Sequence, residues 1–181
     1  MKTWLEILPA FEGEILYMYL DGGGIVTTGC GHALQTPQDA VNVFADPDAA
    51  RQWQAVKHAV PNQPATAYAA LTTLRLSVDQ LQELLTADKA MVDKRLLRDA
   101  PDYQSWPAAA QDACRDITFN VGNVSSFPSM LAAIRAKNWP EAAVQSRRKG
   151  IQEARNQWAA DCFLSLADST PATTTEAEAA T

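Results

Sequence analysis

Long apolar runs are absent from this sequence of 181 residues. No stretch approaches the roughly 18 unbroken apolar residues that a membrane-spanning helix needs. No charged start followed by an apolar run resembles a signal peptide either. We therefore expect no membrane insertion, and synthesis in the cytoplasm without a signal peptide.

Cysteine is also scarce. Cys30, Cys114 and Cys162 are an odd number at wide spacings, and no Cys-x-x-Cys pair suggests a redox centre or a zinc cage. We expect three free thiols, with Cys114 and Cys162 in the core, where unpaired cysteines are most common. With two histidines in the chain, we expect no metal site and no cofactor.

Basic residues are outnumbered, at 15 Lys and Arg against 21 Asp and Glu, which gives a net charge of -6. A negative chain is repelled by the phosphates of nucleic acid. No basic run with interleaved aromatic residues is present. We therefore expect no nucleic-acid partner.

The hydrophobic content of 47% is enough for one compact domain or two small lobes around a core. We predict a fold of the α+β class, mainly α. The predicted domain covers 1–168, with a β-containing lobe at about 13–76 and a helical lobe at about 77–168 that includes the amino-terminal helix. The remaining residues 169–181 have no large apolar side chain, and we predict a disordered tail or linker.

Capping residues, strand formers and turn residues predict the first helix and strands of the chain. Thr3 and Glu6 have the spacing of a capping box, so a short helix should follow Thr3, and Pro9 should kink or shorten it so that it ends near Glu12. The strand formers of 15–20, the turn DGGG from Asp21, and IVTT then predict a β-hairpin. A short extended piece should run through His32.

Further helices are predicted from capping residues and helical spacing. Thr36 before Pro37, and Asp46 before Pro47, should begin two short helices, the second over about 47–60. A loop or linker should follow to residue 70.

The long central helix should begin after Ser77, which forms a capping box with Gln80. Apolar residues then recur at helical spacing, namely Val78, Leu81, Leu84, Leu85, Met91 and Leu96. The last helices are expected near 107–121, 127–137, 140–147 and 151–167.

Glu12 and Asp21 can supply the two carboxyl groups that cleavage of a glycosidic bond requires. One carboxylic acid protonates the leaving oxygen of an oxocarbenium-like transition state, and a second carboxylate lies across the sugar. A helix end beside an apolar segment suits the acid, whereas a glycine-rich turn keeps Asp21 hydrated and lets a sugar approach the backbone near Gly23. Thr27, on the returning strand, can hold a water molecule. Each of these residues alone is more often structural than catalytic.

The whole run of residues 11–32, FEGEILYMYLDGGGIVTTGCGH, closely resembles the active-site segment of the phage-type lysozymes, glycoside hydrolase family 24. The family pattern is Glu-Gly, Tyr-x-Asp, a glycine turn, a threonine and Gly-x-Gly-His, and the intervals match as well as the letters. The resemblance covers nearly the whole of residues 2–167, strongly in this segment, fairly over 78–145 and weakly at the end. The matching residues are Glu12-Gly13, Tyr19-Leu20-Asp21, Gly22 to Gly24, Thr27 and Gly29-Cys30-Gly31-His32.

The resemblance implies roles for these residues. Glu12 would be the general acid, Asp21 would position or activate a water molecule, and Thr27 would help to hold that water in an inverting reaction. Family members usually pair the histidine with an aspartate early in the long helix, so we expect His32 to form a structural salt bridge with Asp88.

Two residues of the second half also take roles from the resemblance. Asn120, in FNVGNVSSF, would contact sugar, although a polar residue at a helix end beside Gly122 is an equally good interpretation. Arg155 in the last helix would reach back to Glu12, with a solvated helical arginine as the alternative.

The implied protein is a lysozyme-like muramidase. It would have a small β-hairpin lobe and a larger helical lobe, joined by a long central helix with a cleft between them. It would hydrolyse the β-1,4 bond between N-acetylmuramic acid and N-acetylglucosamine in bacterial peptidoglycan, its expected partner, as a monomer. Chitin carries similar sugars and stays open as a substrate.

This chain departs from the family in two ways, which change what we expect of access to the cleft and of delivery to the cell wall. The interval from His32 to Ser77 is longer than in compact relatives, so an extra helix or lobe could cover the cleft. Many free lysozymes of this type are basic, whereas this chain is acidic. We hypothesise a module of an interbacterial secretion effector or phage lysin, delivered to the periplasm or cell wall by a holin or a secretion system. An immunity or inhibitor protein would then be a further partner. Strong activity of the isolated domain on intact cells would contradict this hypothesis.

Two other functions compete with a muramidase. Cys30 with His32 or His58 could form a thiol peptidase or amidase that acts on the peptide stems of the wall. Alternatively, the chain could be a lysozyme-shaped module that binds peptidoglycan without turnover.

Overall fold

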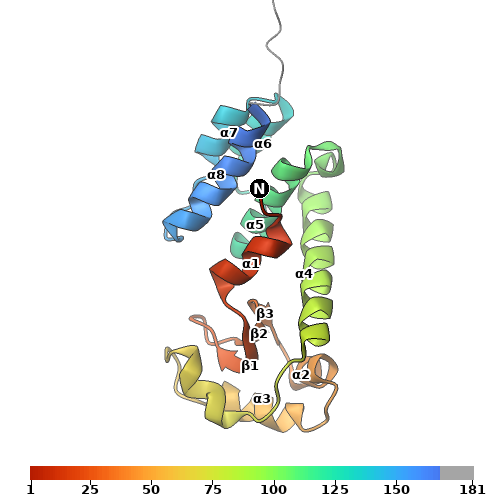
Figure 1. Cartoon of the computed structure of the whole chain (residues 1–181), viewed down its shortest axis with the longest axis vertical. Helices are drawn as coiled ribbons and strands as arrows, with labels where there is room; N and C mark the ends of the chain where they lie inside the picture. The colour runs from red at the N-terminus through yellow and green to blue at the C-terminus, as the bar shows by residue number, and fades with distance from the viewer. Residues whose placement is uncertain (168–181) are drawn as a thin grey trace, which may run out of the picture. The chain divides into compact units, whose positions relative to one another are not determined.

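The computed structural model describes residues 1–167, and these residues form many helices and one small antiparallel sheet (Figure 1). The predicted class, α+β and mainly α, is confirmed. The predicted tail 169–181 lies outside the described residues. The elements are α1 (Trp4–Glu12), β1 (Ile15–Leu20), β2 (Val26–Gly29), β3 (His32–Ala33), α2 (Pro37–Phe44), α3 (Ala49–Lys57), the 3-10 helix η1 (Ala65–Leu71), α4 (Val78–Asp99), the 3-10 helix η2 (Tyr103–Ser105), α5 (Ala108–Val121), α6 (Pro128–Arg135), α7 (Trp139–Gln145) and α8 (Glu153–Ala167).

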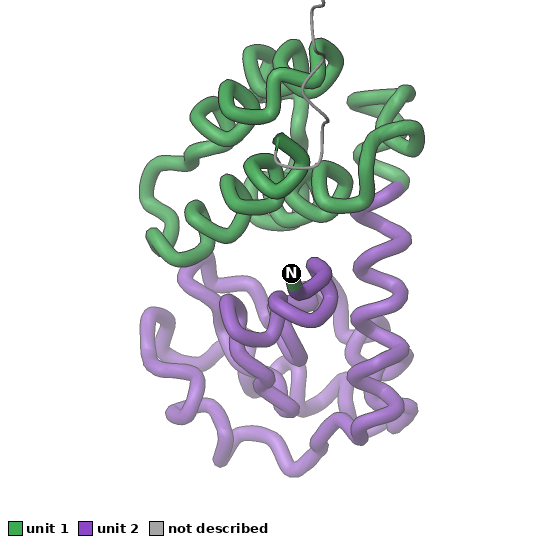
Figure 2. The backbone as a smooth tube through the Cα atoms, turned by 45° about the horizontal axis from the view of Figure 1, so that its top comes forward, with its two compact units in different colours: residues 1, 94–181 green, residues 2–93 purple. Residues whose placement is uncertain are grey.

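The chain divides into two compact units (Figure 2). Unit 2 contains residues 2–93, and unit 1 contains residue 1 and residues 94–167. The division falls within α4, and α1 belongs to unit 2, whereas we expected α1 and the whole long helix to belong to the helical lobe. Among residues 1–167, no helix is long and apolar enough to cross a membrane.

Helix α1 begins and ends where its capping signals predict. The Glu6 carboxylate accepts hydrogen bonds from the backbone N–H of Thr3 (2.7 Å) and from its hydroxyl (2.8 Å). Pro9 lies inside the helix, which continues only to Glu12. Gly13 ends it with φ +78°, a backbone conformation that glycine adopts without strain. Glu12 is therefore held at the helix terminus, directly before the sheet.

The predicted hairpin is present as β1 and β2, which pair antiparallel, and β3 adds a third strand in the order β1-β2-β3. Tyr19 pairs with Thr27, and a bulge interrupts the register between Ile15 and Tyr19. Met18 and Leu20 are buried in β1, and every residue of β2 is buried. The sheet therefore presents the two hairpin strands in a fixed register around the DGGG turn.

The segment between β3 and α4 folds into α2, α3 and η1. Thr36 caps α2, since its side chain accepts the N–H of Asp39 (3.2 Å). Helix α3 begins at Ala49, two residues later than Pro47, because Asp46 instead accepts the N–H of Asp48 (2.8 Å) and forms a turn.

The stretch predicted as a loop up to residue 70 contains η1. Tyr68 explains this difference, because its ring is buried and its hydroxyl donates to the Val60 carbonyl (2.9 Å). A buried aromatic side chain anchors a segment that its prolines alone would leave as a loop.

Helix α4 has the predicted capping box, in which Ser77 N–H donates to Gln80 (2.8 Å) and Gln80 N–H donates to Ser77 (3.2 Å). Of the residues that recur at helical spacing, Leu81, Leu84, Leu85 and Leu96 are buried. Val78 and Met91 are exposed, at 76% and 40%. Val78 is the first residue of the helix, and Met91 lies beside the buried Val92, which faces the core instead.

Unit 1 is a helical assembly in which α5 packs on α8, α8 on α7, and α7 on α6. The four helices predicted from spacing after Pro101 correspond to α5, α6, α7 and α8. Cys114 and Cys162 are buried in this core and are free thiols, as predicted. The core is completed by large side chains such as Met130, Trp139 and Phe163.

Candidate active site

Asp21 organises the turn between β1 and β2 with its side chain. Its Oδ1 accepts the backbone N–H groups of Gly23 (2.9 Å) and Ile25 (2.8 Å). Its backbone N–H donates to the Ile25 carbonyl (3.0 Å), and Gly24 N–H donates to the Asp21 carbonyl (3.0 Å). Its Oδ2 makes no hydrogen bond within residues 1–167. One carboxylate oxygen thus fixes the turn, and the other can accept a hydrogen from a ligand or water.

Thr27 is buried on β2, and its hydroxyl donates to the Ile25 carbonyl (3.1 Å). A hydroxyl that donates its single hydrogen still has lone pairs to accept one. Ile25 therefore links the two predicted residues, since its N–H binds Asp21 and its carbonyl binds Thr27. The structure brings Asp21 and Thr27 into one hydrogen-bonded turn.

Tyr19 is a candidate that we did not select from the sequence, although it belongs to the Tyr-x-Asp pattern. Burial, followed by the negative charges of Glu12 and then Asp21, raises the pKa of its hydroxyl to about 12. Both carboxylates therefore contribute to the raised pKa of the same phenol, which stays protonated at neutral pH. Alternation along a strand could have suggested Tyr19, because residues i and i+2 lie on one face.

His32 and Asp88 form the contact that the family resemblance implies. His32 Nδ1 lies 2.7 Å from Asp88 Oδ1, and the aspartate side chain is 4% exposed. Gly29 allows the close approach of α4, because a Cβ there would lie 3.2 Å from Leu81 Cδ1, and its φ is +62°. The Gly-x-Gly-His segment thus joins β2 and β3 to the first half of α4.

Cys30 lies in the tight turn between β2 and β3 and is buried. Burial, followed by the negative charges of Glu14, Glu12 and Asp88, raises the pKa of its thiol to about 11. A nucleophilic cysteine needs the opposite effect, a pKa lowered toward neutrality. The other histidine of the competing hypothesis, His58, is exposed and hydrogen-bonds through Nδ1 to the Gln54 carbonyl (2.8 Å).

Asn120 and Arg155 belong to unit 1. The Oδ1 of Asn120, near the end of α5, is buried and lacks a hydrogen-bond partner within the described part of the chain. Arg155 is buried and not solvated, since Nη2 lies 2.9 Å from Asp116 Oδ1. The alternative of a solvated arginine is therefore wrong. Its pairing with Glu12 and the sugar contact of Asn120 stay predictions.

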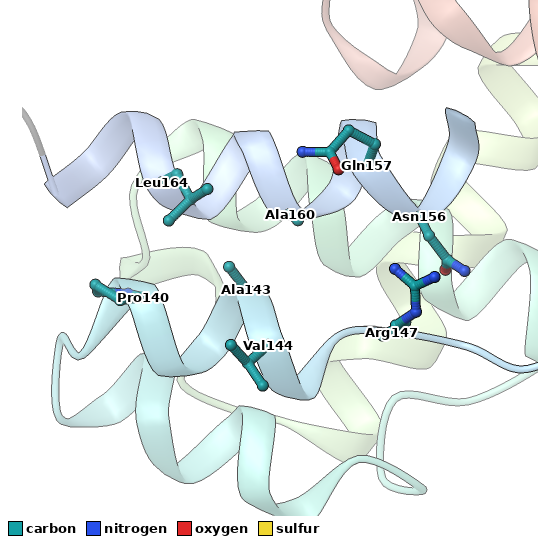
Figure 3. A pocket seen from close by; sticks show the side chains of 8 residues that line it. All are labelled: Pro140, Ala143, Val144, Arg147, Asn156, Gln157, Ala160 and Leu164. Atoms are coloured by element: carbon teal, nitrogen blue, oxygen red, sulfur yellow. The ribbon is translucent and has the colours of Figure 1, made fainter. Parts of the chain in front are cut away.

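Unit 1 also contains a groove of about 420 Å³ between α7 and α8 (Figure 3). None of the eight residues drawn in Figure 3 carries a carboxylate, thiol or imidazole. The groove can bind an apolar group but cannot supply acid or base chemistry. Its apolar lining consists of Pro140, Ala143, Val144, Ala160 and Leu164.

No cluster of metal-ligating side chains suited to an ion is found in residues 1–167. Comparison with models of protein families and with curated proteins gave no match.

Gly23 offers a test of substrate approach that does not disturb the fold. A Cβ at this position would lie 3.4 Å from Asp21 Oδ1, an ordinary contact, and the backbone is not in the left-handed region. We expect Gly23→Ala to keep the melting temperature while lowering glycan cleavage about tenfold, since a methyl group would displace a sugar near Asp21. Thermal unfolding and a reducing-end assay measure the two effects. Unchanged cleavage would show that substrate does not approach Gly23.

Proposed function

We propose that the chain is a muramidase that hydrolyses the β-1,4 bond between N-acetylmuramic acid and N-acetylglucosamine of bacterial peptidoglycan. The supporting observation is the turn in which Asp21 Oδ1 accepts two backbone N–H groups, one of them from Ile25, and the Thr27 hydroxyl binds the carbonyl of the same Ile25. Two carboxylates, Glu12 and Asp21, also contribute to the raised pKa of Tyr19. One comes from a helix end and the other from a glycine turn, as the resemblance to phage-type lysozymes implies. The proposed fold is the lysozyme-like arrangement of that family.

In the proposed reaction Glu12 donates a proton to the glycosidic oxygen as the bond to the sugar breaks. A water molecule attacks the opposite face of the sugar ring and gives its proton to Asp21. Oδ2 of Asp21 is suited to this step, because Oδ1 already accepts two backbone N–H groups. The lone pairs of the Thr27 hydroxyl can accept the second hydrogen of that water. The product sugar would have inverted configuration.

Incubation of the protein with purified peptidoglycan tests the proposal. We expect new reducing ends, and mass spectrometry should find N-acetylmuramic acid at those ends. Fragments with N-acetylglucosamine at the new end would identify a different bond specificity, and cleavage of chitin alone would identify a chitinase. Binding to peptidoglycan without release of reducing ends would favour the module without turnover.

Substitutions of Cys30 test the competing hypothesis of a thiol peptidase or amidase. We expect Cys30→Ser and Cys30→Ala to keep cleavage within about twofold, because a buried thiol whose pKa is about 11 is not a nucleophile at neutral pH. The release of peptide-stem fragments and of reducing ends should be measured together. Loss of peptide cleavage in both variants, with reducing ends absent throughout, would favour the amidase instead.

A further inference from the structure

A lysine from the segment between β3 and α4 binds the turn that holds Asp21. Lys57 is the last residue of α3, and its Nζ donates a hydrogen bond to the Gly24 carbonyl (2.8 Å). Gly24 lies inside the DGGG turn with φ +74° and donates its own N–H to the Asp21 carbonyl (3.0 Å). The bond therefore reaches the backbone of the turn at the residue next to Gly23.

Helix α3 is anchored firmly enough to act as a support for this turn. Trp53 is buried, and its Nε1 donates to the Leu34 carbonyl (2.9 Å) just after β3. Val56 is fully buried, and α3 packs on β1 and β2 (Figure 1). Trp53 and Lys57 are four residues apart and lie on one face of the helix. That face thus spans the sheet from the end of β3 to the β1–β2 turn.

Gln52 links α3 to the segment that leads into α4. Its side chain is 2% exposed, and its Oε1 accepts the N–H groups of Thr73 (2.8 Å) and Leu74 (3.2 Å). Its Nε2 donates to Asp48 (2.8 Å) at the start of the same helix. Because a buried amide with its hydrogen bonds satisfied fixes local geometry, α3 is tied both to the sheet and to the chain that leads into α4.

From these contacts we propose that Lys57 is a positioning residue for the proposed reaction, holding the glycine turn so that Asp21 and Thr27 keep their places around the attacking water. The segment 33–76 would then support the turn rather than only cover a cleft. This inference rests on the proposed function. Lys57 acts through Gly24 and Ile25, so it should affect turnover and not the binding of substrate.

The test compares Lys57→Met with Lys57→Arg and with a control on the same helix, Arg51→Met. Methionine keeps an unbranched stem and removes the donor, and arginine keeps a cation that can reach a carbonyl. Within residues 1–167, Arg51 pairs only with Asp48, on the exposed side. With soluble glycan strands as substrate, we expect Lys57→Met to lower kcat about tenfold and to change KM less than about twofold. Lys57→Arg should recover most of the turnover, and Arg51→Met should match the natural protein.

Hydrogen exchange gives a readout that does not depend on activity. Gly23, Gly24 and Ile25 donate their N–H groups to Asp21, so their amides should exchange several-fold faster in Lys57→Met, at an unchanged melting temperature. Unchanged exchange would overturn the inference, as would a rise in KM without loss of kcat or equal losses in the methionine and arginine variants. A natural protein that cleaves no glycan would refute the proposed muramidase, and with it a role for Lys57 in turnover.

Discussion

Replacement of Glu12 by glutamine is expected to lower the release of reducing ends from peptidoglycan by at least about 100-fold. Glutamine keeps the shape of the side chain but cannot donate an acidic proton to the leaving oxygen. Glu12 ends α1, where Gly13 caps the helix with φ +78° and its N–H donates to the Pro9 carbonyl (2.9 Å). Because the backbone fixes this position, the substitution should change the chemistry and leave the fold intact.

Glu14 provides the matched control for this experiment. It lies two residues away, is exposed and undergoes the same chemical change in Glu14→Gln. We expect Glu14→Gln to cleave peptidoglycan within about twofold of the natural protein, a change too small for loss of a general acid. Circular dichroism should be unchanged in both variants, which shows that the fold is intact. Retention of more than about a tenth of the activity by Glu12→Gln, or an equal loss in Glu14→Gln, would contradict the role of Glu12.

Local signals in the sequence predicted much of the fold of unit 2. The capping pairs Thr3 with Glu6 and Ser77 with Gln80 predicted where α1 and α4 begin, because these hydrogen bonds lie within one helical turn. The DGGG turn predicted the hairpin because its hydrogen bonds also join residues that are close together in the chain. The contact of His32 with Asp88 joins residues far apart in the chain, and it came from the family resemblance.

Features that depend on tertiary contacts could not be predicted. The 3-10 helix η1 is fixed by the burial of Tyr68, and the bond from Lys57 to Gly24 joins a helix to a turn through a backbone carbonyl. A side chain that binds a carbonyl leaves no pattern in the sequence, since any residue can supply that acceptor. Helical spacing includes Met91, yet Met91 is exposed and its neighbour Val92 is buried.

The largest departure from a simple apolar core is a group of three buried charges in unit 1. Arg148 Nη2 lies 2.8 Å from Asp116 Oδ2, and Arg155 Nη2 lies 2.9 Å from Asp116 Oδ1. Asn156 completes the group, as it accepts the Arg148 N–H (3.1 Å) and donates to the Arg148 carbonyl (2.9 Å). Burial lowers the pKa of Arg148 from its usual value, and the charge and hydrogen bond of Asp116 act in the opposite direction. One carboxylate therefore offsets the desolvation of two guanidinium groups.

Asp116→Asn should consequently destabilise the protein by about 3–5 kcal/mol, the cost of leaving buried charge without its partner. In addition, the amide places an N–H donor beside a guanidinium group, at the position where a carboxylate oxygen accepts a hydrogen bond in the natural protein. Denaturant unfolding at neutral pH measures the change, and Asp102→Asn is the control. Asp102 pairs with Arg135 at 3.0 Å, but both side chains are at least 40% exposed, so its loss should cost less than about 1 kcal/mol. Equal effects of the two substitutions would show that Asp116 contributes no more than a surface ion pair.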